Sequence, residues 1–198
     1  MGYYIFSYGI KTEEIQKVFG SNDKELLDRV QSHKTFQSYA KGIGARGLSI
    51  ALMDISTYLP GDNLDSTLDG YALVCICASL GKQLPFRQEF KWGADTDEIA
   101  EVLAEDFGIK DVDIEKLLVE NGHSFPTSQV REPSTSLITL EELKTIKNRL
   151  SSVHITDEKI QELVNNGDNE YTYERLRGLI QNINYCVDHD LDMISFCH

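Results

Sequence analysis

The sequence has 198 residues, of which 41% are hydrophobic and 26% charged, values typical of a soluble globular protein. It contains 32 acidic residues against 19 lysines and arginines, which gives a formal net charge of −13. A chain this acidic, without a cluster of basic residues, is not expected to bind nucleic acid or an anionic membrane surface. No apolar run reaches the roughly 18 residues of a membrane-spanning helix. The charge favours solubility, or a basic protein as the partner.

Residues 3–10, YYIFSYGI, are dense in aromatic and β-branched side chains, a composition that predicts a buried strand. Two stretches with apolar residues at helical spacing follow this strand, over residues 12–19 and 22–37. Polar residues that commonly cap helices precede both stretches. The first part of the chain therefore predicts one strand and then two helices.

Three glycines, Gly42, Gly44 and Gly47, have the spacing G-x-G-x-x-G. A dinucleotide-binding loop with this spacing follows a strand and leads through a helix to an acidic residue on the next strand. Here helical patterns lie on both sides, the second of them over residues 48–59. We therefore interpret the glycines as a connection between two helices.

The helix predicted over residues 67–81 is apolar on nearly every face, which is typical of a helix buried at the centre of a core. Cys75 and Cys77 lie two positions apart on it and face different directions, which does not suit a shared metal ion. We expect both cysteines to pack in the core. Residues 82–93 are irregular, and the part over 84–93 is compatible with one or two further strands.

The C-terminal half alternates predicted helices with one long loop. The loop, residues 122–136, exceeds the roughly 12 residues above which loops are usually functional or mobile. Apolar periodicity and cap residues predict helices over residues 96–108, 111–122, 139–150, 156–167 and 171–189.

The last stretch, CVDHDLDMISFCH, contains the residue types of a zinc site. If residues 191–198 are extended, however, Cys197 lies on the order of 20 Å from His189, because a strand rises about 3.3 Å per residue. Zinc ligands must lie about 2.0–2.3 Å from one point. We therefore predict a buried strand, with Ile194 and Phe196 on one face, and neither a metal site nor a cofactor.

The predicted compartment follows from the N-terminus and the cysteines. The first residues have neither a basic segment nor a long apolar run, so we expect no signal peptide. The four cysteines are too few and too irregularly spaced for a disulfide framework. We expect a cytoplasmic protein with reduced thiols.

Strands are thus predicted at both ends of the chain, with helices between them. Two short strands are stable only within a sheet, so we expect the terminal strands to pair with each other. The predicted fold class is α+β: residues 1–198 form a mainly helical single domain around a small sheet. No repeat of fixed period is present.

One group of residues suggests a ligand-binding cleft. His123 opens the long loop, the loop also contains Arg131, and the only tryptophan, Trp92, lies in the irregular stretch before it. A histidine and an arginine beside an aromatic ring suit an anion. The alternative interpretation is a solvated histidine at a helix end. No catalytic motif occurs, so no catalytic residue is predicted, and the chain is more consistent with a protein that is not an enzyme.

Short motifs across most of the chain resemble a family of uncharacterised bacterial proteins of about this length. They include a strand M-x-Y, a helix start G-S-x-D-x-x-L-L, and a closing strand F-x-H. The residues that carry the resemblance are Met1, Tyr3, Tyr8, Gly20, Ser21, Asp23, Leu26, Leu27, residues 51–55, residues 70–73, Phe196 and His198. The resemblance implies an α+β fold with paired termini and no established activity. It also implies a shared surface or packing site near the last strand, with Tyr71 and His198 as candidates.

Two functions remain open from the sequence. The first is a non-enzymatic, cytoplasmic protein-binding module that masks a basic protein, as immunity proteins do for toxins. The alternative is a small-molecule-binding domain or a cryptic hydrolase, with a cleft near Trp92, His123 and Arg131. The sequence does not indicate an oligomeric state.

Overall fold

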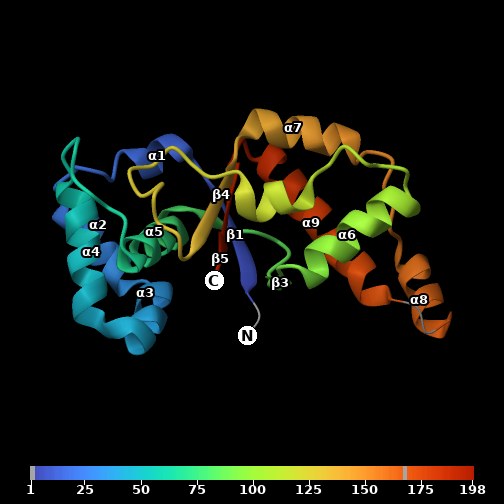
Figure 1. Ribbon diagram of the computed structural model, residues 1–198, viewed down its shortest axis with the longest axis horizontal. Helices are drawn as coiled ribbons and strands as arrows, with labels where there is room; N and C mark the ends of the chain where they lie inside the picture. The colour runs from blue at the N-terminus through green and yellow to red at the C-terminus, as the bar shows by residue number, and fades with distance from the viewer. Residues whose placement is uncertain (1–2, 167–168) are drawn as a thin grey trace.

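The structure is a computed structural model that describes residues 3–166 and 169–198. A small antiparallel sheet lies between two groups of helices (Figure 1). Its main strand order is β2-β1-β5-β4, and β3 also pairs with β1. The predicted mainly helical α+β fold is confirmed. The strands are β1 (Tyr4–Ile10), β2 (Lys82–Gln83), β3 (Phe90–Lys91), β4 (Ser134–Ile138) and β5 (Asp192–Cys197).

The first and last strands pair with each other, as predicted, and they form the centre of the sheet. β1 and β5 are antiparallel, from the pair Ile5–Cys197 to the pair Ile10–Asp192. Beyond β5, His198 exchanges two backbone hydrogen bonds with Tyr4, of 2.9 and 3.0 Å. The strand β4 on the other edge of β5 was not predicted, because its sequence STSLI falls at the end of the predicted loop and in the two residues before the next predicted helix.

The first group of helices covers the face of the sheet that carries Ile194 and Phe196. It lies on the left of Figure 1 and contains the buried central helix α5, as predicted. The three glycines fall in and just after a π-helical turn between two helices, which confirms their interpretation as a connection. The elements are α1 (Thr12–Gln16), α2 (Lys24–Ser32), α3 (Lys34–Tyr39), η1 (Ala40–Gly44), α4 (Ala45–Thr57) and α5 (Thr67–Leu80).

The second group covers the opposite face, which carries Ile5, Met193 and Cys197. Its long helix α9 packs against α6, α7 and α8 (Figure 1). Gly167, where one predicted helix ends, lies outside the described residues. The elements are α6 (Ala94–Glu105), η2 (Lys116–Glu120), which is a π-helical segment, α7 (Leu140–Arg149), α8 (Asp157–Asn166) and α9 (Glu170–Asp188).

The long loop predicted over residues 122–136 is packed onto the first group of helices. Phe125 is buried, and its ring stacks on Phe19 with centroids 6.0 Å apart. A Cβ atom at Gly70 of α5 would lie only 2.7 Å from Val130 and 2.8 Å from Pro133. Glycine at that position therefore lets the loop approach α5 closely.

Two further sequence-based expectations have a structural outcome. All four cysteines are free and buried, so their thiols pack in the core as expected for Cys75 and Cys77. Among residues 3–166 and 169–198, no helix is both long enough and apolar enough to cross a membrane.

Candidate functional site

Trp92 lies on the surface beside the first turn of α6. Its indole Nε1–H donates a 2.7 Å hydrogen bond to Glu115, and the edge of its ring contacts Tyr3, with centroids 5.7 Å apart. The side chain is 37% exposed. Trp92 is therefore available to a partner, but its neighbours are an aromatic ring and a carboxylate rather than the predicted histidine and arginine.

His123 and Arg131 have different surroundings from Trp92. The backbone N–H of Phe125 donates to Nδ1 of His123, and burial lowers the pKa of the His123 ring to about 4. The ring is thus uncharged at neutral pH and offers no positive charge to an anion. Arg131 is exposed, and only its backbone oxygen is hydrogen-bonded, by Ser134. Across the described chain, no hydrogen bond, ion pair or ring contact joins any two of the three predicted cleft residues.

Tyr71 and His198, in contrast, lie together. The Tyr71 hydroxyl and Nδ1 of His198 are 3.4 Å apart. Tyr39 of α3 contacts both rings, at centroid distances of 4.9 and 6.1 Å. Phe6 of β1 lies 5.3 Å from the His198 ring on the sheet side. These residues form an aromatic cluster where α3 and α5 meet the sheet.

Three exposed aromatic residues mark the beginning of β1 and the end of β3. Tyr3, Tyr4 and Trp92 are 48%, 43% and 37% exposed. The backbone N–H of Trp92 donates to the Tyr3 oxygen, and Tyr4 pairs with Lys91 across the strands. The rings are therefore presented by the paired ends of a sheet rather than by a free loop.

Exposed carboxylates lie on α6, which begins two residues after Trp92. Asp97, Glu101 and Glu105 follow one another at intervals of four residues, so they form a stripe on one face of the helix. All three are exposed, and in the part of the chain that the structure describes none of them forms an ion pair or a side-chain hydrogen bond. We call Tyr3 and Trp92, whose rings are in contact, together with this stripe, the aromatic–acidic face. Tyr4 points to the opposite face of the sheet, because successive side chains alternate along a strand.

The net charge of the protein is concentrated around this face. Residues 94–120 contain ten acidic and two basic residues, and residues 157–174 contain six acidic and one basic, so these two segments carry the whole net charge of −13. They include α6 and α8, which lie on the right of Figure 1, the start of α9, and η2, which packs against β4 and β5. The rest of the chain is neutral overall by residue count. Its residues Arg149, Arg175 and Arg177 pair with Asp111, Asp95 and Asp157, so the side of α6 and α8 is acidic but partly neutralised.

A cleft lies at the other edge of β1, between β2 and β3. β1 pairs with β2 at Tyr8 and Gly9, and with β3 at Tyr4 and Ile5, but Ser7 has no partner strand there. Hydrogen bonds alternate along an antiparallel strand, and Tyr4 bonds toward His198, so Ser7 directs its N–H and C=O into the cleft. We call this cavity, of about 510 Å³, the β1-edge cleft.

The lining of the β1-edge cleft combines aromatic rings with polar and charged groups. Its inner wall is β1, its outer wall is the segment 84–89, and residues of α3 complete it. Burial raises the pKa of the Tyr8 and Tyr39 hydroxyls, so both remain neutral hydrogen-bond donors at neutral pH. The lining residues are Phe6, Ser7, Tyr8, Lys34, Thr35, Ser38, Tyr39, Gln83, Leu84, Phe86, Arg87, Gln88, Glu89, Phe90 and Asn182.

One face of α9 holds the outer wall of the cleft in place. Asn182 accepts a 2.9 Å hydrogen bond from the Phe86 N–H and donates one of 3.0 Å to the Phe86 oxygen. One turn earlier, Gly178 leaves space for the Phe86 ring, which would lie 2.3 Å from a Cβ atom at that position. Arg175, one turn before that, donates to the backbone oxygen of Glu89. The segment is thus anchored at Phe86 and at its last residue, Glu89.

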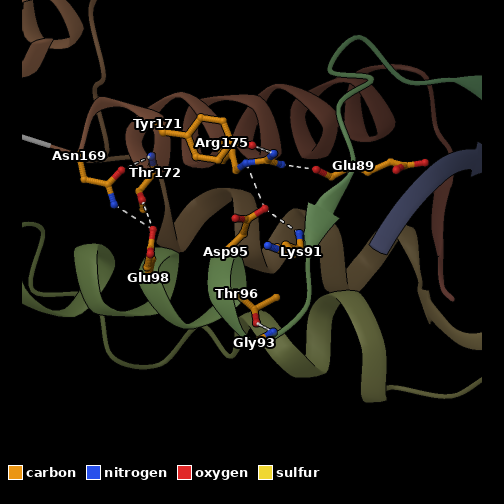
Figure 2. Close-up of polar contacts among 10 residues, drawn as sticks. All are labelled: Glu89, Lys91, Gly93, Asp95, Thr96, Glu98, Asn169, Tyr171, Thr172 and Arg175. Carbon is orange, nitrogen blue, oxygen red and sulfur yellow. Dashed lines mark hydrogen bonds and ion pairs between the residues drawn. The ribbon is translucent and has the colours of Figure 1, made fainter. Parts of the chain in front are cut away.

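A buried ion pair fixes the adjoining strand β3. Figure 2 shows Arg175 of α9 directed at Asp95 of α6, with Nε and Oδ2 3.0 Å apart. The Nε–H does not point along the contact, so the two groups attract as charges rather than through a hydrogen bond. The same Asp95 oxygen accepts a 2.6 Å hydrogen bond from the Lys91 N–H, and the Arg175 group stacks on Tyr171. The pair therefore joins α6, α9 and β3.

Sequence reasoning missed the β1-edge cleft, because its residues come from four separate segments, over residues 6–8, 34–39 and 83–90 and at Asn182. The only local signal was in the irregular stretch 82–93, where short strands flank the sequence LPFRQE. That stretch alone shows neither the gap beside Ser7 nor the contribution of α3. The gap beside Ser7 depends on strand register, and the contribution of α3 depends on helix packing. Short stretches of sequence do not encode either of these tertiary features.

The whole chain, residues 1–198, matches the model of one family, described as a domain of unknown function (DUF7691), and the chain belongs to that family. This confirms the resemblance to a family without an established activity. The comparisons with curated proteins and with solved structures found no match.

Proposed function

We propose that the protein is a non-enzymatic, cytoplasmic protein-binding module, and that the aromatic–acidic face binds a basic protein. The observation that supports this most strongly is the excess of carboxylates in residues 94–120 and 157–174, the first of which begins two residues after the exposed Trp92. A uniformly acidic surface would serve solubility alone. Charge on one side, next to exposed rings, is what electrostatic complementarity to a single partner requires.

The chemistry of the face suits lysine and arginine side chains. Tyrosine and tryptophan are the residues that most often dominate the binding energy of protein interfaces. Their ring faces attract cations, and the free carboxylates of Asp97, Glu101 and Glu105 attract them over a longer range. A partner bound here has its positive charge covered, which is the immunity-like masking proposed for this chain.

The test is affinity capture from a lysate of the organism that carries the sequence, with the purified chain as bait. We expect a stoichiometric basic protein at about 0.1 M salt and its loss at about 1 M, because the Debye length falls from about 10 to about 3 Å. The variant Asp97→Asn, Glu101→Gln, Glu105→Gln should lose this protein at low salt as well.

A control variant distinguishes the effect of the carboxylates on the aromatic–acidic face from the effect of the total net charge. Glu13→Gln, Glu25→Gln, Asp28→Asn changes the total charge equally, on exposed positions of α1 and α2. It should retain the basic protein. If both triple variants behave alike, or if the parent chain captures no basic protein, the proposal is wrong.

The alternative function, a small-molecule site or a hydrolase formed by Trp92, His123 and Arg131, remains a prediction. No observed contact brings the three residues together, and the uncharged ring of His123 weakens the case for an anion at that place. The structure offers a different cavity for a small ligand, lined by residues other than those of the aromatic–acidic face.

A further inference from the structure

The β1-edge cleft has the dimensions and the framework of a ligand site. Its volume of about 510 Å³ lies within the roughly 300–1,000 Å³ of small-molecule pockets. Its outer wall is held by Asn182, Gly178 and Arg175 of α9. The cleft is thus formed before any ligand binds, so little conformational entropy is lost on binding.

The charges in the cleft favour an anion. The lining contains two basic side chains, Lys34 from α3 and Arg87 from the outer wall, against one acidic side chain, Glu89. Within the described residues, neither Lys34 nor Arg87 forms an ion pair or a hydrogen bond. These two cations lie on different elements that line the same cavity, in a chain whose net charge is −13. Both are available to a negatively charged group of a ligand.

The remaining lining suits a flat apolar body with a polar edge. Tyr39, Phe86 and Phe90 provide aromatic surface, and the rings of Phe86 and Phe90 lie 5.5 Å apart. The backbone N–H and C=O of Ser7 point into the cavity, where no backbone group of the described chain bonds to them. A ligand that reaches Ser7 gains hydrogen bonds that the sheet leaves unmade.

We propose that the β1-edge cleft binds a small organic anion with an aromatic or other flat body. Its charged oxygens pair with Lys34 and Arg87, its body packs against Tyr39 and Phe86, and its polar edge meets the Ser7 backbone. A carboxylate and a phosphate ester present the same charged oxygens, and both match the planar fork of an arginine.

The test is a titration followed by backbone amide NMR, with 2-naphthoate, 2-naphthyl phosphate and the neutral 2-naphthamide as probes. We expect at least one of the two anions to shift the Ser7 amide resonance at up to millimolar concentrations. The anion that binds more tightly shows whether the cleft prefers a carboxylate or a phosphate ester. The neutral amide should bind about ten-fold more weakly or worse, because charge-assisted hydrogen bonds are about twice as strong as neutral ones.

Matched variants test the two cations. Lys34→Gln with Arg87→Gln should weaken binding of the preferred anion about ten-fold or more, for the same reason. Lys17→Gln with Lys24→Gln removes the same charge from positions outside the cleft and should bind like the parent. The replaced side chains are exposed, so equal melting temperatures verify that all variants fold. Equal binding by the two double variants, equal binding of the neutral amide, or no shift at Ser7 would overturn the proposal.

Discussion

Arg175 and Asp95 form the most deeply buried ion pair that the structure shows. Asp95→Ala leaves the guanidinium buried without its counter-charge, which costs about 3–5 kcal/mol for pairs of this kind. The double variant Asp95→Leu, Arg175→Met should recover much of that loss, because an apolar pair of similar volume is often as stable as an ion pair. Urea unfolding measures both. A single variant as stable as the parent would contradict the role given to the pair.

His123 makes the stability of the fold depend on pH. Burial lowers its pKa from 6.5 in the unfolded chain to about 4 in the folded protein, so the unfolded chain binds the proton more readily. The contribution of the uncharged His123 ring to the free energy of unfolding is complete above pH 6.5. It is lost as the pH falls from 6.5 to about 4.

The measurement is the free energy of unfolding at several pH values for the parent and for His123→Asn. An asparagine oxygen can still accept from the Phe125 N–H, as in an Asx turn, but it does not titrate. The variant should therefore lose less stability between pH 6.5 and 4 than the parent. Parallel curves for the two proteins would count against the assigned pKa.

At the scale of the element, α9 acts as a support for the outer wall of the cleft. Gly178→Ala should force the Phe86 ring away and destabilise the protein by about 1–3 kcal/mol, as overpacking does. It should also shift the amide resonances of residues 84–89. Gly42→Ala is the matched control, because a Cβ atom there meets nothing within 4 Å. Equal stability of the two variants would show that the wall does not depend on Gly178.

The elements that the sequence predicted well are those whose own composition or apolar periodicity is distinctive. The apolar helix α5, the terminal strands and the helix predicted over residues 139–150 were all confirmed. β4 was missed because STSLI has only two large apolar residues and becomes a strand by pairing with β5. β2 and β3 are only two residues long, and the neighbouring β1 determines them. Tertiary pairing decided these segments, and local propensity did not.

For the candidate sites too, the sequence identified individual residues better than it identified which residues lie together. Trp92 was singled out from the sequence and is an exposed part of the aromatic–acidic face. Tyr71 and His198 were also singled out and are in contact. The expected grouping of Trp92 with His123 and Arg131 stays without a supporting contact, because their positions depend on how the long loop packs onto α5.

At the scale of the whole molecule, the carboxylates of the acidic side repel one another, and this repulsion destabilises the folded protein. Raising sodium chloride from about 0.1 to about 1 M shortens the Debye length from about 10 to about 3 Å and screens that repulsion. The melting temperature of the parent should therefore rise with salt. The rise should be smaller for Asp97→Asn, Glu101→Gln, Glu105→Gln. If the melting temperature falls or stays constant as the salt concentration rises, repulsion between the carboxylates does not destabilise the protein.

The position of the only tryptophan allows the partner surface to be observed directly. A chain produced with 5-fluorotryptophan has one fluorine resonance, from Trp92. We predict that this resonance shifts or broadens when the captured basic protein is added, and that high salt restores it. The variant Asp97→Asn, Glu101→Gln, Glu105→Gln should show no change at the same partner concentration. A partner that binds while the Trp92 resonance stays unchanged would place the interface elsewhere and contradict the proposed function.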